Sequence, residues 1–189
     1  MASHTRAHLP ALRLAFIVAL LGAQFAQPAA AQDADAAFAY FDRQCLQKGP
    51  DFDGTEETAR AAGWTLLPAK ALKTLTPFGD ASDTQGWITS AEGSPLRVVV
   101  VSKGATETES VRACTVGLYG VDAKTLETSI SSRLGFPPQG SEQAGELSYD
   151  RRLEADPPRL ITLSFPSKAQ GTAAAVASVI SGHDLIPPQ

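Results

Sequence analysis

The spacing of apolar residues divides the chain into a short apolar leader, a helical part and a strand-rich remainder. The leader is the ten-residue run 14–23, which follows Arg6 and Arg13 and no acidic residue. A run of this length matches the core of a secretory signal peptide and is shorter than the roughly 20 residues of a spanning helix. Small residues after it predict cleavage between Ala31 and Gln32, so residues 1–31 are interpreted as a signal peptide.

The chain that follows the leader begins with a helical pattern. Phe38, Phe41 and Cys45 recur at spacings of three and four and therefore share one side of a helix. Gly49 and the proline after it should end this helix. Cys45 is therefore expected to face the core.

Two further helices are predicted. A short one fits residues 56–62, with Asp53 or Thr55 as its N-terminal cap. A longer one fits residues 123–134, because apolar residues recur at steps of three and four after Asp122, a suitable cap. This longer helix should cover one face of a sheet.

The apolar period changes to two after residue 86, which predicts strands. The predicted strands are 87–90, 96–102, 111–119, 146–153 and 160–165. In the third of these, Cys114, Val116 and Leu118 share one face, so Cys114 should also point inward. Residues 172–181 are ambiguous, since their alanines favour a helix and their β-branched residues favour a strand; we favour the strand.

These elements indicate one α+β domain over residues 32–189. Short links between successive strands imply antiparallel pairing, so we expect an antiparallel sheet of about five to six strands. One long covering helix and two short N-terminal helices complete the prediction. Residues 66–86 are expected to form an irregular connection with one short element near 69–72.

Cysteine usage adds a crosslink to this picture. Cys45 and Cys114 are the only cysteines, and an exported domain folds in an oxidising compartment, so we expect one disulfide between them. It would join the first helix to a central strand. Their spacing matches neither a redox dithiol nor a zinc site, so the predicted bond is structural.

Charge and hydropathy argue against two classes of partner, nucleic acids and membranes. The chain has 16 basic and 20 acidic residues, and loss of the leader removes two arginines and no acid. An acidic surface repels phosphate backbones and anionic lipids, which argues against nucleic-acid binding and docking to a membrane surface. Beyond the leader the longest strongly apolar run is 98–101, so no membrane span is expected in the mature form.

Few residues suited to catalysis follow the leader. His183 is the only histidine there, which leaves too few imidazoles for a histidine-based zinc site, and asparagine is absent. No Gly-x-Ser-x-Gly elbow, Ser-x-x-Lys pattern or phosphate-binding glycine loop occurs, and we expect no cofactor. Trp64 and Trp87 are interpreted as core anchors, although exposed tryptophans would instead mark a contact surface.

A resemblance rests on scattered positions. Residues 38–64, with their helix cysteine, Pro-Asp-Phe loop and Gly-Trp pair, precede Trp87 and the Cys-Thr-Val sequence at Cys114. This arrangement resembles small exported bacterial proteins of unassigned function. The resemblance implies a periplasmic or secreted location and carries over no catalytic residue.

The sequence therefore predicts a non-enzymatic binding or accessory domain of the bacterial cell envelope. Its partner would be an envelope protein or ligand. Two alternatives stay open: a hydrolase of unfamiliar type that uses carboxylates or His183, and an inhibitor of envelope hydrolases that presents loop 49–54 or loop 105–110.

Overall fold

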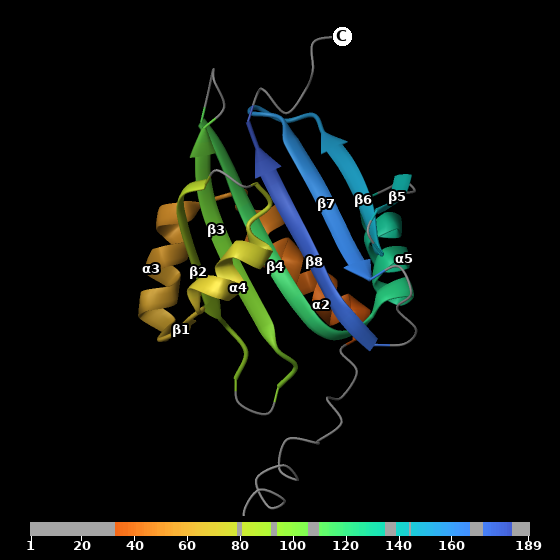
Figure 1. Cartoon of the computed structure of the whole chain (residues 1–189), viewed down its shortest axis with the longest axis horizontal. Coiled ribbons are helices and arrows are strands. Elements are labelled where there is room, and N and C mark those ends of the chain that lie inside the picture. Colours follow the sequence, from red (N-terminus) through yellow and green to blue (C-terminus); the bar gives the residue numbers. More distant parts are fainter. Residues whose placement is uncertain are drawn as a thin grey trace, which may run out of the picture.

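A single antiparallel sheet with helices on both faces makes up the fold (Figure 1). The computed structural model describes residues 33–78, 81–91, 94–105, 110–134, 139–143, 145–166 and 172–182. The predicted signal peptide, its cleavage site at Ala31 and Gln32, and His183 lie outside these ranges. The α+β class and the antiparallel pairing are confirmed.

The sheet has the strand order β1-β2-β3-β4-β8-β7-β6-β5. Its strands are β1 Thr65–Leu66, β2 Ala81–Ile88, β3 Arg97–Ala105, β4 Ser110–Asp122, β5 Gln139–Gln143, β6 Glu146–Leu153, β7 Arg159–Pro166 and β8 Thr172–Ser181. Strands β1 to β4 and β5 to β8 form two meanders, and the last strand of each pairs with the other at the centre. The ambiguous segment 172–181 is therefore a strand.

The expected five to six strands are too few, because the sheet continues to two edges that lack an apolar pattern. Strand β1 has two residues, and β5 has the polar sequence Gln-Gly-Ser-Glu-Gln. Such edge strands are held by backbone hydrogen bonds and bury little apolar surface. Hydrophobic periodicity therefore does not reveal them.

Helices cover both faces of the sheet. They are α2 Ala34–Phe41, the π-helix η1 Asp42–Leu46, α3 Phe52–Ala62, α4 Ala69–Leu75 and α5 Ala123–Leu134. The expectation of one long covering helix is wrong: α2, η1, α3 and α5 share one face, and α4 packs on the other (Figure 1). A helix about 10 Å wide spans roughly two strand spacings, so an eight-stranded sheet needs several. None of the described helices is long and apolar enough to cross a membrane.

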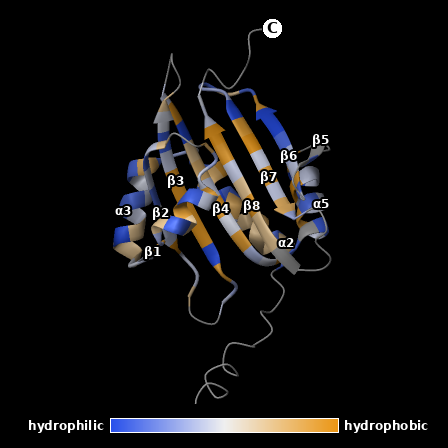
Figure 2. Ribbon diagram, viewed as in Figure 1, coloured by the Kyte–Doolittle hydropathy of each residue, from blue (hydrophilic) through white to orange (hydrophobic). Residues whose placement is uncertain are grey.

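The main core lies between the sheet and the helices α2, η1, α3 and α5. Cys114, Val116 and Leu118 of β4 all face it, as predicted, and none is solvent-exposed. Val98 and Val100 of β3 instead contact the opposite side, where α4 packs. Strand β3 is thus buried on both faces along its valine run, 98–101, which agrees with the orange part of this strand in Figure 2.

Helix α3 begins at Phe52, four residues before the predicted start. Its cap is Asp51, whose Oδ1 accepts a hydrogen bond of 3.0 Å from the Gly54 amide. Asp53 and Thr55, the predicted caps, lie inside the helix, and the Thr55 hydroxyl donates to the Asp51 carbonyl at 2.6 Å. The helix ends at Gly63, whose φ of 64° is left-handed.

The segment 66–86 is more regular than predicted. The short element expected near 69–72 is α4, but the segment also contains most of β2, which was not predicted there. Helix α4 packs closely on the sheet because Gly86 has no side chain. A Cβ at Gly86 would lie 2.7 Å from Leu72 Cδ2 and 3.0 Å from Leu67 Cδ1. The pattern is hard to read because a seven-residue helix is followed by a strand with polar residues at its exposed edge.

Candidate functional site

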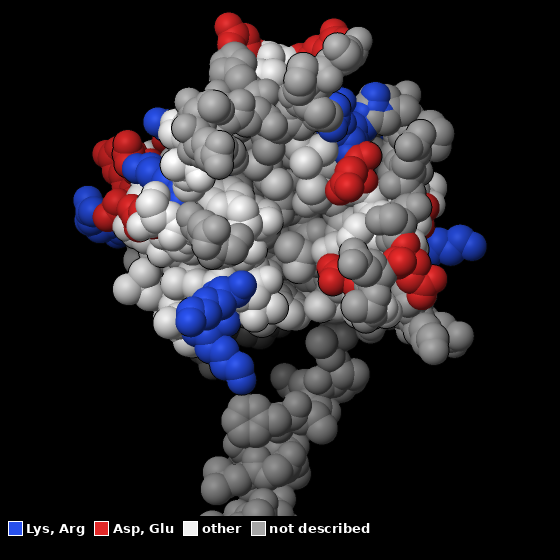
Figure 3. Space-filling view, turned by 45° about the horizontal axis from the view of Figure 1, so that its top comes forward, with Lys and Arg blue, Asp and Glu red and all other residues white. Residues whose placement is uncertain are grey.

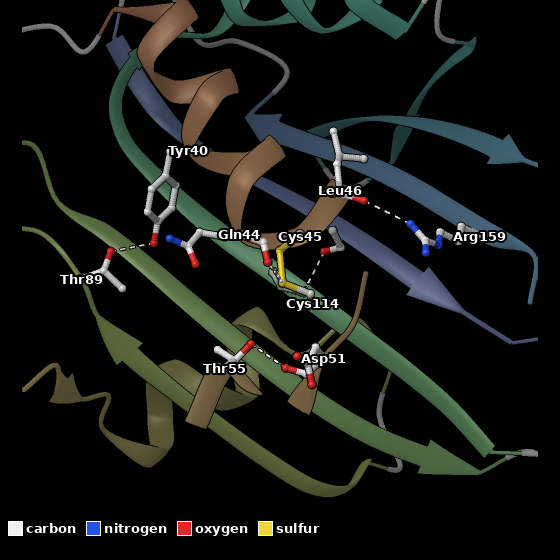
Figure 4. Close-up of a disulfide and its surroundings, with 11 residues drawn as sticks. Tyr40, Gln44, Cys45, Leu46, Asp51, Thr55, Thr89, Cys114 and Arg159 are labelled. Atoms are coloured by element: carbon white, nitrogen blue, oxygen red, sulfur yellow. Dashed lines mark hydrogen bonds between the residues drawn. A yellow bond between two sulfur atoms is a disulfide. The ribbon is translucent and has the colours of Figure 1, made fainter. Parts of the chain in front are cut away.

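The disulfide fixes the end of the first helical segment against the centre of the sheet. Cys45 of η1 and Cys114 of β4 are bonded, with their Cα atoms 5.4 Å apart, and neither residue is exposed. The predicted crosslink is confirmed. Cys114 Sγ also lies 3.5 Å from the Gln44 carbonyl oxygen, but a disulfide sulfur has no hydrogen to donate, so this is a contact (Figure 4).

A groove opens where η1 ends, and we call it the basic groove. Its volume is about 450 Å³. It is bounded by the turn after η1, the start of α3 and the neighbouring ends of β4, β7 and β8. The lining residues are Lys48, Gly49, Pro50, Asp51, Ser110, Arg112, Pro157, Arg159, Ser181 and Gly182.

Strand register places two arginines side by side in this groove. Arg112 of β4 pairs with Ser181 of β8, and Ser181 pairs in turn with Arg159 of β7. Because Arg112 stands two residues before Cys114, and Arg159 two before Ile161, both share the core-facing side of the sheet. Their Cα atoms are separated by two strand spacings, roughly 10 Å.

Arg159 is the more firmly held of the two. Its Nη1 donates a hydrogen bond of 3.1 Å to the Leu46 carbonyl at the end of η1 (Figure 4). Its guanidinium also lies against Gly49, where an added Cβ would be 3.1 Å from Nη2. Its Nε is buried and has no hydrogen-bond partner among the described residues. The side chain is therefore positioned, while part of its donor capacity is unused.

The charges of the described lining residues do not balance. Among these residues, Lys48, Arg112 and Arg159 face one carboxylate, Asp51, which already accepts a hydrogen bond as the cap of α3. The ion pairs found within the described ranges are elsewhere: Arg60 with Glu56, Lys103 with Asp53, and Arg133 with Asp35. The groove thus concentrates positive charge in a chain whose net charge is −4.

The face drawn in Figure 3 does not show one dominant sign of charge among its described residues. Among the residues drawn in colour in Figure 3, acidic and basic side chains form small separate groups. Lys103, the cross-strand neighbour of Arg112, is neutralised by Asp53 at 3.2 Å and lies 3.9 Å above the Phe52 ring. The cationic row across the sheet is therefore compensated at Lys103 and uncompensated in the groove.

A second groove lies on the other side of η1, and we call it the Trp64 groove. Its volume is about 360 Å³. Trp64 is half-buried in this groove. The Tyr40 and Thr89 hydroxyls are joined by a hydrogen bond of 2.6 Å. The Arg97 guanidinium lies 5.2 Å from the centre of the Tyr40 ring. Burial raises the pKa of Tyr40 to about 12, so the phenol is neutral. This groove offers an aromatic contact surface.

The two tryptophans do not form one surface. Trp87 is 4% exposed and packs in the main core opposite Val99, as the core-anchor interpretation expects. It is therefore not available as a contact residue in the folded chain. Trp64, which follows the end of α3, is the tryptophan that reaches a groove.

Residues from both segments proposed for an inhibitor line the basic groove. Gly49, Pro50 and Asp51 from loop 49–54, and Ser110 from loop 105–110, all line it; residues 106–109 lie outside the described ranges. No cluster of three or more histidine, cysteine or acidic side chains suited to a metal occurs in the part of the chain that the structure describes.

Sequence reasoning missed Lys48, Arg112 and Arg159, because they come from three segments that the fold brings together. A partial signal exists in the strands. Arg112 and Arg159 each occupy a core-facing position of an otherwise apolar row, which is an unfavourable place for a charge unless it stays near solvent or an anion. The strand pairing that joins them cannot be read from either strand alone.

Comparison with known proteins gives no relative. The chain matches no family model, and no curated protein or solved structure is significantly similar to it.

Proposed function

We propose that this chain is an exported, non-enzymatic binding domain of the bacterial cell envelope, and that it binds an anionic ligand in the basic groove. The observation that carries the proposal is the charge of that groove. Lys48, Arg112 and Arg159 line it without an ion pair to any described carboxylate. Convergent cations with unused donors favour an anion, and hydrogen bonds between charged partners are the stronger kind.

The lining suits binding better than catalysis. The described lining residues include two serines, Ser110 and Ser181, and no histidine or cysteine, and Asp51 is engaged as a helix cap. A serine nucleophile needs a neighbouring base to become reactive. The arginines are always charged and serve to hold and orient anions. The residues present therefore support recognition of a ligand.

Export is supported by the leader and by the disulfide. The leader has the charge and length of a signal peptide. A structural disulfide is typical of proteins that fold outside the cytoplasm. Mass analysis of the protein purified from periplasm and medium tests this step, and we expect a chain that begins at Gln32.

Binding is tested by NMR titration of the purified protein with inorganic phosphate, pyrophosphate, tripolyphosphate and acetate. We expect at least one of these anions to shift the amide signals of Gly49 and Gly182 in a saturable way. The double substitution Lys48→Gln and Arg112→Gln should weaken that binding by at least about tenfold, because it removes two charge-assisted contacts.

The matched control is Arg152→Gln. Arg152 is exposed and alternates with Arg151 on β6, so its side chain stands on the opposite face of the sheet from the groove. It should leave binding unchanged. If none of the four anions shifts groove signals, or if Arg152→Gln weakens binding as much as the groove variant does, the proposal is wrong.

A second candidate function is inhibition of an envelope hydrolase. It is favoured by the position of Gly49, Pro50 and Asp51 beside Ser110 at one rim, because an inhibitor presents an exposed segment to the enzyme that it blocks. Pull-down from an envelope extract tests it. Capture of a hydrolase by the wild type, lost when Pro50 and Asp51 are both replaced by alanine, would favour inhibition over small-ligand binding.

A further inference from the structure

We infer that the ligand of the basic groove is a small soluble oligophosphate, with at least two linked phosphate groups that contact Arg159 and Arg112 together. This inference rests on the proposed function, since it specifies the ligand of the same groove. It follows from the spacing of the two arginines, the size of the groove and the charge of the rest of the chain.

The groove contains two cationic positions with different properties. On one side, Arg159 donates a hydrogen bond to the Leu46 carbonyl and packs against Gly49. Lys48, which precedes Gly49 in the same turn, also lines the groove. On the other side, Arg112 is exposed, and no hydrogen bond or ion pair joins its side chain to another described residue. Ser181 of β8 lies between Arg112 and Arg159 in the sheet. The Cα atoms of the two arginines are therefore separated by two strand spacings, roughly 10 Å.

A ligand with one anionic group would contact one of the two arginines and leave the other without a contact. A guanidinium binds one phosphate or carboxylate through two parallel hydrogen bonds, so a single group engaged by Arg159 satisfies that arginine and leaves Arg112 with little to contact. The groove volume of about 450 Å³ leaves room for more than one phosphate group. Two or three linked phosphates would extend from Arg159 toward Arg112, across the roughly 10 Å between their Cα atoms.

The charge of the whole chain favours a small ligand over an extended anionic surface. Acidic residues outnumber basic ones by 20 to 16, so the chain as a whole repels an extended anion such as a membrane surface or a nucleic acid. A small ligand inside the groove is affected mainly by charges within a Debye length, about 8 Å at physiological ionic strength. Lys48, Arg112 and Arg159 then dominate.

Isothermal titration with inorganic phosphate, pyrophosphate and tripolyphosphate tests the inference at one fixed ionic strength. We expect affinity to rise along this series, with tripolyphosphate bound at least about tenfold more tightly than phosphate, because each further charged contact contributes. Sedimentation with phosphatidylcholine vesicles that contain cardiolipin tests whether the linked phosphates belong to a lipid instead of a soluble ligand. We expect the protein not to bind these vesicles.

Substitution of each arginine in turn separates the two positions. Arg112→Gln should weaken tripolyphosphate at least about tenfold while changing phosphate less than about threefold, because phosphate is held on the Arg159 side. Arg159→Lys, which keeps the charge but loses the planar fork, should weaken all three anions. Arg152→Gln on the opposite face is again the control.

The outcomes separate this inference from the proposed function. If phosphate, pyrophosphate and tripolyphosphate bind equally, or if Arg112→Gln affects them equally, the groove binds anions but the inference is overturned. Stronger binding to cardiolipin vesicles than to tripolyphosphate also overturns it. If no anion binds, including acetate, the proposed function fails as well.

Discussion

Removal of the disulfide should be the most damaging single covalent change in this fold. The perturbation is the double substitution Cys45→Ala and Cys114→Ala. It removes the covalent bond between η1 and β4 and places two alanines at the fully buried positions 45 and 114. Since the two residues are 69 positions apart, their bond restricts much of the unfolded chain.

The expected loss follows from that separation. In the chain-entropy model, a closed loop of this length stabilises the folded state by about 4 kcal/mol. The loss of two buried sulfur atoms adds to this, because their neighbours relax only in part. The total is comparable with the 5–15 kcal/mol by which typical domains are stable, so the variant should be close to the limit of folding at about 25 °C.

Urea unfolding followed by far-UV circular dichroism measures the effect. With a slope of about 2 kcal/mol per molar urea, the midpoint should fall by about 2 M. Wild-type protein kept reduced with dithiothreitol is the matched control and should unfold near the variant. A midpoint shift below about 0.5 M would show that the unfolded chain gains little freedom from the cut, and the reasoning would be refuted.

Two other predictions use the same unfolding assay. Gly117→Ala should lower the free energy of unfolding by about 1–3 kcal/mol, because the added Cβ would lie 2.5 Å from Val98 Cγ2 in a packed layer; an unchanged midpoint would contradict this. Tyr40→Phe should cost about 1 kcal/mol at neutral pH, since it removes the bond to Thr89. Because the folded pKa of Tyr40 is raised to about 12 and its usual pKa is 10.0, wild-type stability should fall as pH rises from 10 to 12, and the gap to Tyr40→Phe should narrow there.

Local patterns were a good guide wherever an element buries one apolar face. The row Cys114, Val116 and Leu118 was placed correctly, because a period of two allows one inward assignment for a strand with a buried face. The helix predicted over residues 123–134 matches α5, since Leu126 and Ile130 are buried at helical spacing. These patterns are reliable because the apolar positions are the ones that the fold buries.

Elements stabilised mainly by backbone pairing were missed. Strand β5 and the first half of β2 carry polar residues because they lie at or near sheet edges, so their sequences resemble loops. The early start of α3 was missed for a related reason. Asp51, Asp53 and Thr55 are all suitable caps, and only the fold selects the first.

The basic groove lies where the core-facing rows of the sheet extend beyond their helical cover. Helix η1 ends at Leu46, and the disulfide one residue earlier fixes how far that cover reaches. In β7 the row Phe165, Leu163 and Ile161 continues to Arg159, which lies just past the end of the cover.

An apolar residue at position 159 would continue this row and pack against Leu46 without desolvating a charge. Instead, the chain carries an arginine there whose Nε is buried and has no partner among the described residues. A charged group in that position costs free energy, and one hydrogen bond to a carbonyl offsets only part of the cost. Because stability alone favours the apolar choice, the arginine supports the anion binding that we propose for this groove.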